Sequence, residues 1–396
     1  MAQISTSATA ESGTSAEQRD GAPHAGADSK AAPLERVSAL GQSVWIDNLS
    51  RESNRSGHLL GLIEQNSVVG ATSNPTIFQK AMSEGDAYDE EIAELARETS
   101  DAGAVFWKLA ERDVCEACDI FSGVFERTEG RDGYVSIEVD PGLAYDTLHS
   151  FREAIRLHTE IAKPNLLVKI PATKPGLGAI EDVIAKGRSV NITLIFSLQR
   201  YAEVVESYIR GLERLIAEGG DPRHVTSVAS FFVSRIDTEA DKRLDAIAGT
   251  DRLKGRLAVA NAKLAYQHYK ESFSGPRWEF LASKGAKVQR VLWASTSTKN
   301  PAYPDTLYVD DLIGPETVNT MPEETMVAYQ DHGNPAPRLE EGLEDAHRVF
   351  EELGHIGVDY DDVTDTLERE GVEKFMASFE EAVSSLASKV SAASRG

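Results

Sequence analysis

Lys169 is the residue whose surroundings most clearly suggest chemistry, because it stands inside the apolar segment NLLVKIP. Burying an ammonium group among residues such as Val168 and Ile170 is costly unless the group is paired or has lost its proton. A neutral lysine amine can attack a ketone and form an imine. A lysine near a strand end could instead extend its ammonium group to solvent. The segments described next favour the first interpretation, an imine-forming nucleophile.

Three other segments alternate polar and apolar residues, as strands with one polar face do. Asp47 in SVWIDNL, Glu138 in YVSIEV and Thr193 in NITLIF fall on the polar faces of their segments. Ser136 and Asn191 share two of these faces. A lysine, two carboxylates, an amide and a hydroxyl at one barrel mouth contain the groups that carbonyl chemistry driven by imine formation needs.

The elements that must position these residues form a series of short apolar or alternating segments, with helical segments between many of them. This pattern is typical of β-α units and a parallel sheet, and eight strands close a barrel. The sequence therefore predicts one α/β domain over residues 35–396, an (α/β)₈ TIM barrel with extra helices. The eight predicted strands are Ser43–Leu49, Ser67–Ser73, Tyr134–Val139, Asn165–Pro171, Ser189–Phe196, Thr226–Val233, Lys287–Ala294 and Asp305–Val309.

Helical periodicity supports the same fold. Apolar residues recur at helical spacing over 180–184 and again over 201–215, each stripe ending at glycine. We also expect two helical patterns between the second and third strands, an extended helical block over 239–283, and helices over 340–353 and 372–390 after the last strand.

Charge and composition limit the classes of function. The chain has 396 residues, 64 acidic and 41 Lys or Arg, and its net charge of −23 opposes binding to nucleic acid or anionic membranes. It has no apolar run of about 18 residues and no secretory signal, so we expect a cytoplasmic protein. Residues 1–34 contain few large apolar side chains and are predicted to be disordered. Four acidic residues against one arginine argue against a transit peptide there.

Other motifs are better explained as structural. Cys115 and Cys118 have CxxC spacing, but no second pair exists for zinc and the surrounding segment is helical. Gly176 and Gly178 lack the remaining residues of a phosphate loop and are expected to open a helix. The acidic run 359–362 lacks the pattern of a calcium loop and is expected to cap a helix. We expect no metal site.

Seven segments, in order along the chain, resemble the transaldolase family, in particular its actinobacterial-type branch. They are VWIDNLSRE, GATSNPTIF, YVSIEVDP, LLVKIPAT, NITLIFS, ASFFVSRID and WASTSTKNP. The resemblance extends from about Leu34 to the C-terminal helices. It implies a class I aldolase on an (α/β)₈ barrel, which acts on sugar phosphates and needs neither metal nor cofactor.

The resemblance also implies roles for single residues. Lys169 matches the imine-forming lysine, Asp47 the acid/base at the C4 hydroxyl of the substrate, and Glu138 the acid/base that acts through a water. Thr193 matches the residue that positions this water. Substrate-binding positions are matched by Asn74, Asn191 and Ser230 for the dihydroxyacetone part, and by Arg235, Ser297 and Lys299 for the phosphate. Lys299 stands where the family often has arginine, so it offers a point charge instead of a two-pronged donor.

The implied reaction moves a dihydroxyacetone unit from sedoheptulose 7-phosphate to glyceraldehyde 3-phosphate, giving erythrose 4-phosphate and fructose 6-phosphate. Two alternatives stay open: a related aldolase that releases the three-carbon unit, and a barrel without activity that serves as a scaffold. Loss of Lys169, Asp47 or Glu138 would mark the scaffold, and all three are present. Lys299 is a rival nucleophile, but it follows four small polar residues, where solvent would keep it protonated.

Overall fold

A closed barrel of eight parallel strands forms the centre of the protein. The computed structural model describes residues 31–393. Each strand pairs with the next along the chain, and the eighth pairs with the first. The fold is therefore a TIM barrel, as predicted. The strands are β1 (Gln42–Ile46), β2 (Val68–Ala71), β3 (Val135–Glu138), β4 (Leu166–Pro171), β5 (Val190–Ile195), β6 (Ser227–Phe232), β7 (Arg290–Ala294) and β8 (Thr317–Met321).

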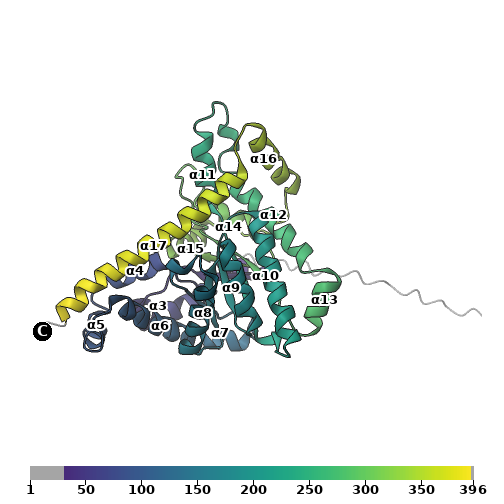
Figure 1. Cartoon of the computed structure of the whole chain (residues 1–396). Helices are drawn as coiled ribbons and strands as arrows, with labels where there is room; N and C mark the ends of the chain where they lie inside the picture. The colour runs from purple at the N-terminus through teal and green to yellow at the C-terminus, as the bar shows by residue number, and fades with distance from the viewer. Residues whose placement is uncertain (1–30, 394–396) are drawn as a thin grey trace, which may run out of the picture.

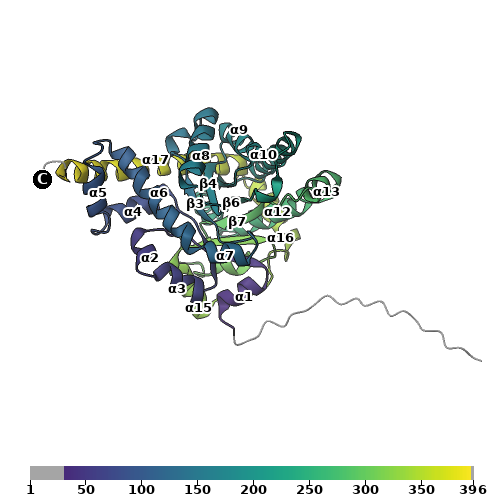
Figure 2. The ribbon, with the colours of Figure 1, turned by 90° about the horizontal axis from the view of Figure 1, so that it is seen from below.

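Helices surround the barrel on its outer side (Figures 1 and 2). None of them, within residues 31–393, is both long and apolar enough to cross a membrane. They are α1 (Pro33–Ala39), α2 (Arg51–Arg55), α3 (His58–Gln65), α4 (Pro75–Ser83), α5 (Asp89–Leu95), α6 (Ala102–Ile120), α7 (Ser122–Arg127), α8 (Thr147–Ile161), α9 (Lys174–Ala185), α10 (Leu198–Ala217), α11 (Ser234–Leu244), α12 (Leu257–Ser272), α13 (Gly275–Ser283), α14 (Leu307–Asp311), α15 (Glu323–His332), α16 (Leu343–His355) and α17 (Tyr360–Ala393).

The first seven predicted strands are confirmed, but the eighth is wrong. The predicted segment Asp305–Val309 overlaps helix α14, and the eighth strand is Thr317–Met321, which pairs with β1 along its whole length. The sequence TVNTM lacks an apolar strand pattern because three of its buried residues are polar. Their side chains are hydrogen-bonded to other barrel elements: Thr317 to Gln42, Asn319 to Thr296 and Thr320 to Thr72.

The predicted helices are present, with one difference in number. The stripes over 180–184 and 201–215 lie in α9 and α10, and the C-terminal patterns lie in α16 and α17. Between β2 and β3 the chain forms four helices, α4 to α7, where two patterns were expected. Cys115 and Cys118 are both in α6 and are free thiols. Thr173 caps α9 at Gly176, and Asp359 accepts hydrogen bonds from the first backbone amides of α17.

The end of the predicted tail is part of the fold. Residues 1–30 lie outside the described residues, whereas Pro33 and Leu34 form the first turn of α1. Proline suits the first helical position because its missing N–H would have no partner there. Leu34 is fully buried, so the described fold includes the last residues assigned to the tail.

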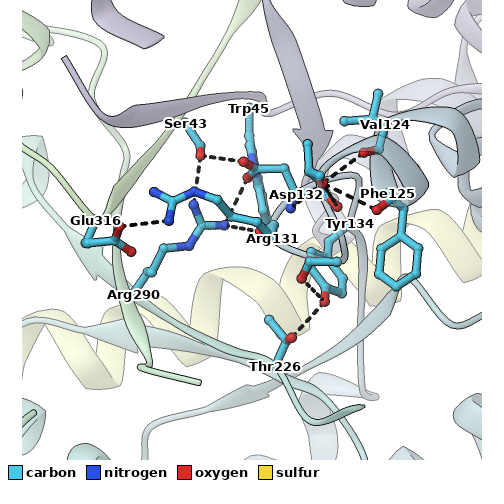
Figure 3. Close-up of polar contacts among 12 residues, drawn as sticks. Ser43, Trp45, Val124, Phe125, Arg131, Asp132, Tyr134, Thr226, Arg290 and Glu316 are labelled. Atoms are coloured by element: carbon cyan, nitrogen blue, oxygen red, sulfur yellow. Dashed lines mark hydrogen bonds and ion pairs between the residues drawn. The ribbon is translucent and has the colours of Figure 1, made fainter. Parts of the chain in front are cut away.

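A buried polar network closes the N-terminal end of the barrel (Figure 3). The guanidinium of Arg290 donates to Oδ1 of Asp132 at 2.9 Å and to the hydroxyl of Ser43 at 2.7 Å. Ser43 in turn donates to Asp132. The indole of Trp45 also donates to Asp132, and its ring lies against Gly70, where a Cβ would come within 2.5 Å of it. Side chains of the network therefore fill the barrel interior at this end.

Helix α17 crosses the C-terminal side of the barrel (yellow in Figure 1). It contacts β5 at Gly371, where a Cβ would lie 3.0 Å from Leu194, so only a small residue allows this approach without a shift. Further along, Phe379 packs edge-on against Phe106 of α6, with ring centroids 5.0 Å apart. These contacts fix one face of α17 above the strand ends that carry the predicted site.

Candidate active site

Lys169 lies inside the barrel, as predicted. Its residue is 4% exposed, and its amine donates a hydrogen bond to the carbonyl of Ser73 at 3.1 Å. The Nζ atom is 3.5 Å from Oε2 of Glu138. Register explains this contact, because Glu138 of β3 and Lys169 of β4 are direct partners in the parallel pair. Asn191 is the partner of Lys169 on the other side, in β5.

Glu138 is a buried carboxyl group whose pKa is raised into the physiological range. Burial raises its pKa to about 7, while the positive charge of Lys169 opposes that rise. Apart from Lys169, its oxygens have no polar partner among residues 31–393, and neither does the buried hydroxyl of Thr193. A carboxyl with such a pKa can both donate and accept a proton at physiological pH.

Asp47 follows β1 and faces the same space. Its Oδ1 accepts a hydrogen bond from the hydroxyl of Thr72 at 2.6 Å, and Thr72 also contacts the hydroxyl of Thr320 at 2.7 Å. Burial raises the pKa of Asp47, and the charge of Lys169 partly offsets this effect. Sequence analysis did not single out either threonine. Thr320 could not be found, because β8 was placed in the wrong segment.

A hydrogen-bonded row of side chains lies beside the lysine. Ser230 of β6 donates to the amide oxygen of Asn191 at 2.7 Å, and the amide nitrogen of Asn191 donates to Ser136 at 3.0 Å. The row fixes the orientation of the amide. Asn74 caps α4 by accepting from the backbone amide of Ile77, so its own amide NH₂ is the group left to donate to a ligand.

Two residues with positive φ lie next to these side chains in the sequence. Leu194 in β5, directly after Thr193, has φ +59°, and the pairing of β5 with β6 shifts register there. Ser295 directly follows β7 and has φ +56°. Positive φ is unfavourable for residues other than glycine and is concentrated at functional sites. Ser295 begins the loop that carries Ser297 and Lys299.

Cationic groups form the outer part of the site. Arg235 is the second residue of α11, and its guanidinium carbon lies 5.2 Å from the ring centre of Phe232. Lys299 donates a short hydrogen bond to the hydroxyl of Ser297. Burial lowers the pKa of Arg235 and of Lys299. Lys374 of α17 lies at the same end and was not among the predicted residues, because helical periodicity does not show which turn passes over the barrel.

One cavity of about 300 Å³ connects these groups. Eight of the ten predicted residues line it: Asp47, Asn74, Lys169, Thr193, Ser230, Arg235, Ser297 and Lys299. Glu138 and Asn191 lie behind this lining, in contact with Lys169 and Ser230. A larger cavity of about 500 Å³ lies at the N-terminal ends of the strands and contains none of the predicted residues. Residues distant in the sequence thus converge on one C-terminal pocket.

A buried lysine beside a carboxylate at the C-terminal mouth of an α/β barrel defines the class of barrel enzymes that can form an imine with a carbonyl substrate. Comparison with known proteins gives the family. The family model described as Transaldolase/Fructose-6-phosphate aldolase matches residues 44–386. The chain therefore belongs to this family, which confirms the resemblance seen in the sequence.

Curated relatives agree with this assignment. The protein named transaldolase from Acidothermus cellulolyticus is 52% identical over 351 residues, which are 88% of this chain and 94% of the relative. The transaldolase of Mycobacterium bovis is 52% identical over 352 residues, again 88% and 94% of the two chains. That of Frankia alni is 48% identical over 362 residues, or 90% and 97%. The similarity therefore covers nearly the whole of each relative.

Proposed function

We propose that this protein is a transaldolase that transfers a dihydroxyacetone unit from sedoheptulose 7-phosphate to glyceraldehyde 3-phosphate, a reaction of the pentose phosphate pathway. The observation that carries the proposal is the buried amine of Lys169, 3.5 Å from the carboxylate of Glu138, in a pocket that Asp47 also lines. The family and the names of the relatives support the same reaction.

Imine formation is the first part of the reaction. The ammonium of Lys169 first gives its proton to the neighbouring carboxylate of Glu138. The amine then attacks the ketone carbon and forms a carbinolamine, whose hydroxyl must leave as water. Glu138, with a pKa of about 7, supplies the proton for this departure and takes one back when the imine is later hydrolysed. Among the described residues, the oxygens of Glu138 have no polar partner besides Lys169, and the hydroxyl of Thr193 has none. This supports a water held between the two side chains, because buried polar groups seldom lack a partner.

Cleavage and transfer follow from the protonated imine. Asp47 takes the proton of the C4 hydroxyl, the C3–C4 bond breaks, and its electron pair enters the imine to give an enamine and free erythrose 4-phosphate. The enamine carbon then attacks the aldehyde of glyceraldehyde 3-phosphate, and Asp47 returns its proton to the new alkoxide. Hydrolysis releases fructose 6-phosphate and restores the amine of Lys169.

Binding residues divide the pocket into two ends. Asn74, Asn191 and Ser230 surround the lysine and suit the hydroxyl groups of the three-carbon unit. The cationic end with Arg235, Ser297 and Lys299 suits the phosphate. A local cationic group is needed because the net charge of −23 repels anionic sugars at longer range.

The surroundings implied by this function are those of central metabolism. Free thiols at Cys115 and Cys118 suit a reducing compartment, and together with phosphorylated substrates they support a cytoplasmic location. The acidic net charge argues against nucleic acid and anionic membranes as partners. Sugar phosphates are compatible with this charge only because the cationic end of the pocket can bind them.

Borohydride trapping tests the proposal. Incubation with fructose 6-phosphate and reduction should give a stable three-carbon adduct on Lys169, identified by peptide mass analysis. Without sugar, no adduct should form. An adduct on Lys299 would reverse the assignment of the two lysines, and no adduct at all would exclude the mechanism.

A second measurement separates transfer from release. With fructose 6-phosphate alone, a transferase holds the three-carbon unit, and product accumulates only after an acceptor such as erythrose 4-phosphate is added. Steady production of free dihydroxyacetone without acceptor would identify an aldolase that releases its ketone.

A further inference from the structure

We propose that Lys374 of helix α17 is a further phosphate-binding residue, so that the C-terminal helix forms part of the substrate site. This inference rests on the proposed function and assigns one more residue to its specificity for phosphorylated sugars. Lys374 lines the same cavity as Arg235, Ser297 and Lys299, although more than 70 residues separate it from each of them in the sequence.

Packing on both sides of Lys374 holds it over the cavity. Val372 and Phe375 are buried, with 2% and 3% exposure, and Phe375 itself lines the cavity. One turn earlier, Gly371 lets α17 approach Leu194 closely. The backbone around Lys374 is therefore anchored against the barrel, while its side chain is exposed and lines the cavity.

Three cations line this end of the cavity and form no ion pair within the described residues. Among residues 31–393, no salt bridge joins Arg235, Lys299 or Lys374 to a carboxylate, although other charged side chains of α17 are paired, for example Lys389 with Asp89. The charge of Arg235 is the main cause that lowers the pKa of Lys374, and Lys299 adds to this effect. Like charges repel, so their convergence is unfavourable unless an anion neutralises them during function.

The neighbouring cavity has the opposite charge. It measures about 440 Å³ and shares Asp47, Ile77, Lys80 and Pro322 with the site. Besides Asp47, four further carboxylates line it: Glu52, Glu84, Glu323 and Glu324. A phosphate dianion would be repelled from that side and drawn to the end that Lys374 completes.

A phosphate group has enough charge and acceptor oxygens to bind Lys374 in addition to Arg235 and Lys299. Its terminal oxygens can accept from several donors, and an arginine can serve two of them at once. Lys299 offers only a point charge with rotatable donors. Lys374 lines the same cavity from helix α17 and would supply the remaining charge and donors.

Binding of inorganic phosphate to the full chain, followed by ³¹P NMR titration, tests this role without requiring turnover. Lys374→Ala should raise the dissociation constant by about tenfold, the loss of one hydrogen bond to a charged group. Lys374→Arg should retain most of the affinity. The matched control is Arg369→Ala, which removes one cation from the same helix at a residue that lies near Tyr145 and not in the cavity.

The outcomes separate this inference from the proposed function. The Michaelis constant for fructose 6-phosphate should rise in Lys374→Ala with little change in kcat, and Arg369→Ala should behave as the wild type. Equal effects of the two alanine variants, or no loss of phosphate affinity in Lys374→Ala, would overturn the role of Lys374. If phosphate affinity depends on Lys374 but no imine can be trapped, the phosphate site stands and the transaldolase mechanism falls.

Discussion

At the scale of residues, the reactive centre depends on one register position. The pairing of Glu138 with Lys169 places a carboxylate beside an amine, and the neighbouring pairing with Asn191 adds an amide. Strand parity was visible in the sequence, so the inward faces of these strands could be predicted. The 3.5 Å contact between Lys169 and Glu138 could not be predicted. Strand parity fixes the face on which a residue lies, but it does not fix the height of that residue in the barrel.

Removal of the nucleophile should abolish turnover. Lys169→Met keeps most of the side-chain volume but has no amine, so no imine can form, and we expect kcat to fall by at least about 10³-fold. A steady-state assay with fructose 6-phosphate and erythrose 4-phosphate measures this, with circular dichroism as the control for folding. Retention of more than a tenth of the activity would show that another group is the nucleophile.

Protonation of Glu138 should govern the rate of imine formation. Its pKa is raised to about 7, so the acid form that expels water is present below pH 7 and is lost as pH rises through that value. The rate of adduct formation, measured by quenching with borohydride at successive pH values, should therefore fall above pH 7. Glu138→Gln should be slower by about 10²-fold and should lack this inflection.

The raised pKa of Glu138 also affects the stability of the fold. Between the ordinary glutamate pKa near 4.5 and the folded value of about 7, the folded chain holds a proton that the unfolded chain has released. The contribution of Glu138 to the free energy of unfolding therefore declines as pH rises across this interval.

Arg235 should act on binding more than on chemistry. Its guanidinium lies at the cationic end of the cavity, so Arg235→Ala is expected to raise the Michaelis constant for fructose 6-phosphate by about 10- to 100-fold. The matched measurement uses unphosphorylated fructose, whose kcat/KM should change little. Equal losses with both sugars would contradict a phosphate role.

At the scale of elements, the predictions succeeded where burial leaves an apolar pattern. Strands such as Leu166–Pro171 are buried on both faces and read as continuous apolar runs. The prediction of strand β8 failed because Thr317, Asn319 and Thr320 are polar. Their hydrogen bonds are made inside the protein, and a sequence pattern does not reveal this. The role of α17 was missed for a related reason: its periodicity predicts a helix, but the part of the barrel that it crosses is a tertiary property.

Close packing within the barrel predicts the effect of a small substitution in β2. A Cβ on Gly70 would lie 2.5 Å from the indole of Trp45, so Gly70→Ala should lower the free energy of unfolding by about 1–3 kcal/mol through overpacking. The matched control is Gly61→Ala in α3, where a Cβ meets nothing within 4 Å. That variant should gain up to about 1 kcal/mol from helix propensity. Urea unfolding of both variants measures the difference, and equal values would contradict the contact.

At the scale of the whole molecule, the two ends of the barrel carry different tasks. The N-terminal end is held by the network of Arg290, Asp132 and Ser43, in which charge and hydrogen bonds are satisfied internally. At the C-terminal end, among residues 31–393, the oxygens of Glu138 have no polar partner besides Lys169, and the hydroxyl of Thr193 has none. The three cations of the proposed phosphate site form no salt bridge within the same residues. Oε1 of Gln42 and of Gln289, at the N-terminal ends of their strands, also lack a partner among the described residues, so the two ends differ mainly in how their charged groups are paired.

This division predicts that damage to the N-terminal network reduces stability without removing the chemistry. Asp132→Ala leaves the buried charge of Arg290 without its partner, so we expect the free energy of unfolding to fall by about 3–5 kcal/mol. The control, Glu316→Ala, breaks the exposed ion pair with Arg131 and should cost no more than about 1 kcal/mol.

The network variant Asp132→Ala should keep its catalytic activity. Below the unfolding temperature, its kcat/KM should stay within about threefold of the wild type, because substitutions in the network and in the active site act independently. Trp45 is a direct link between the two ends, since it donates to Asp132 and precedes Asp47 by two residues. A loss of activity as large as that of Lys169→Met, with folding retained, would show that the network positions Asp47 through β1 and that the two ends are coupled.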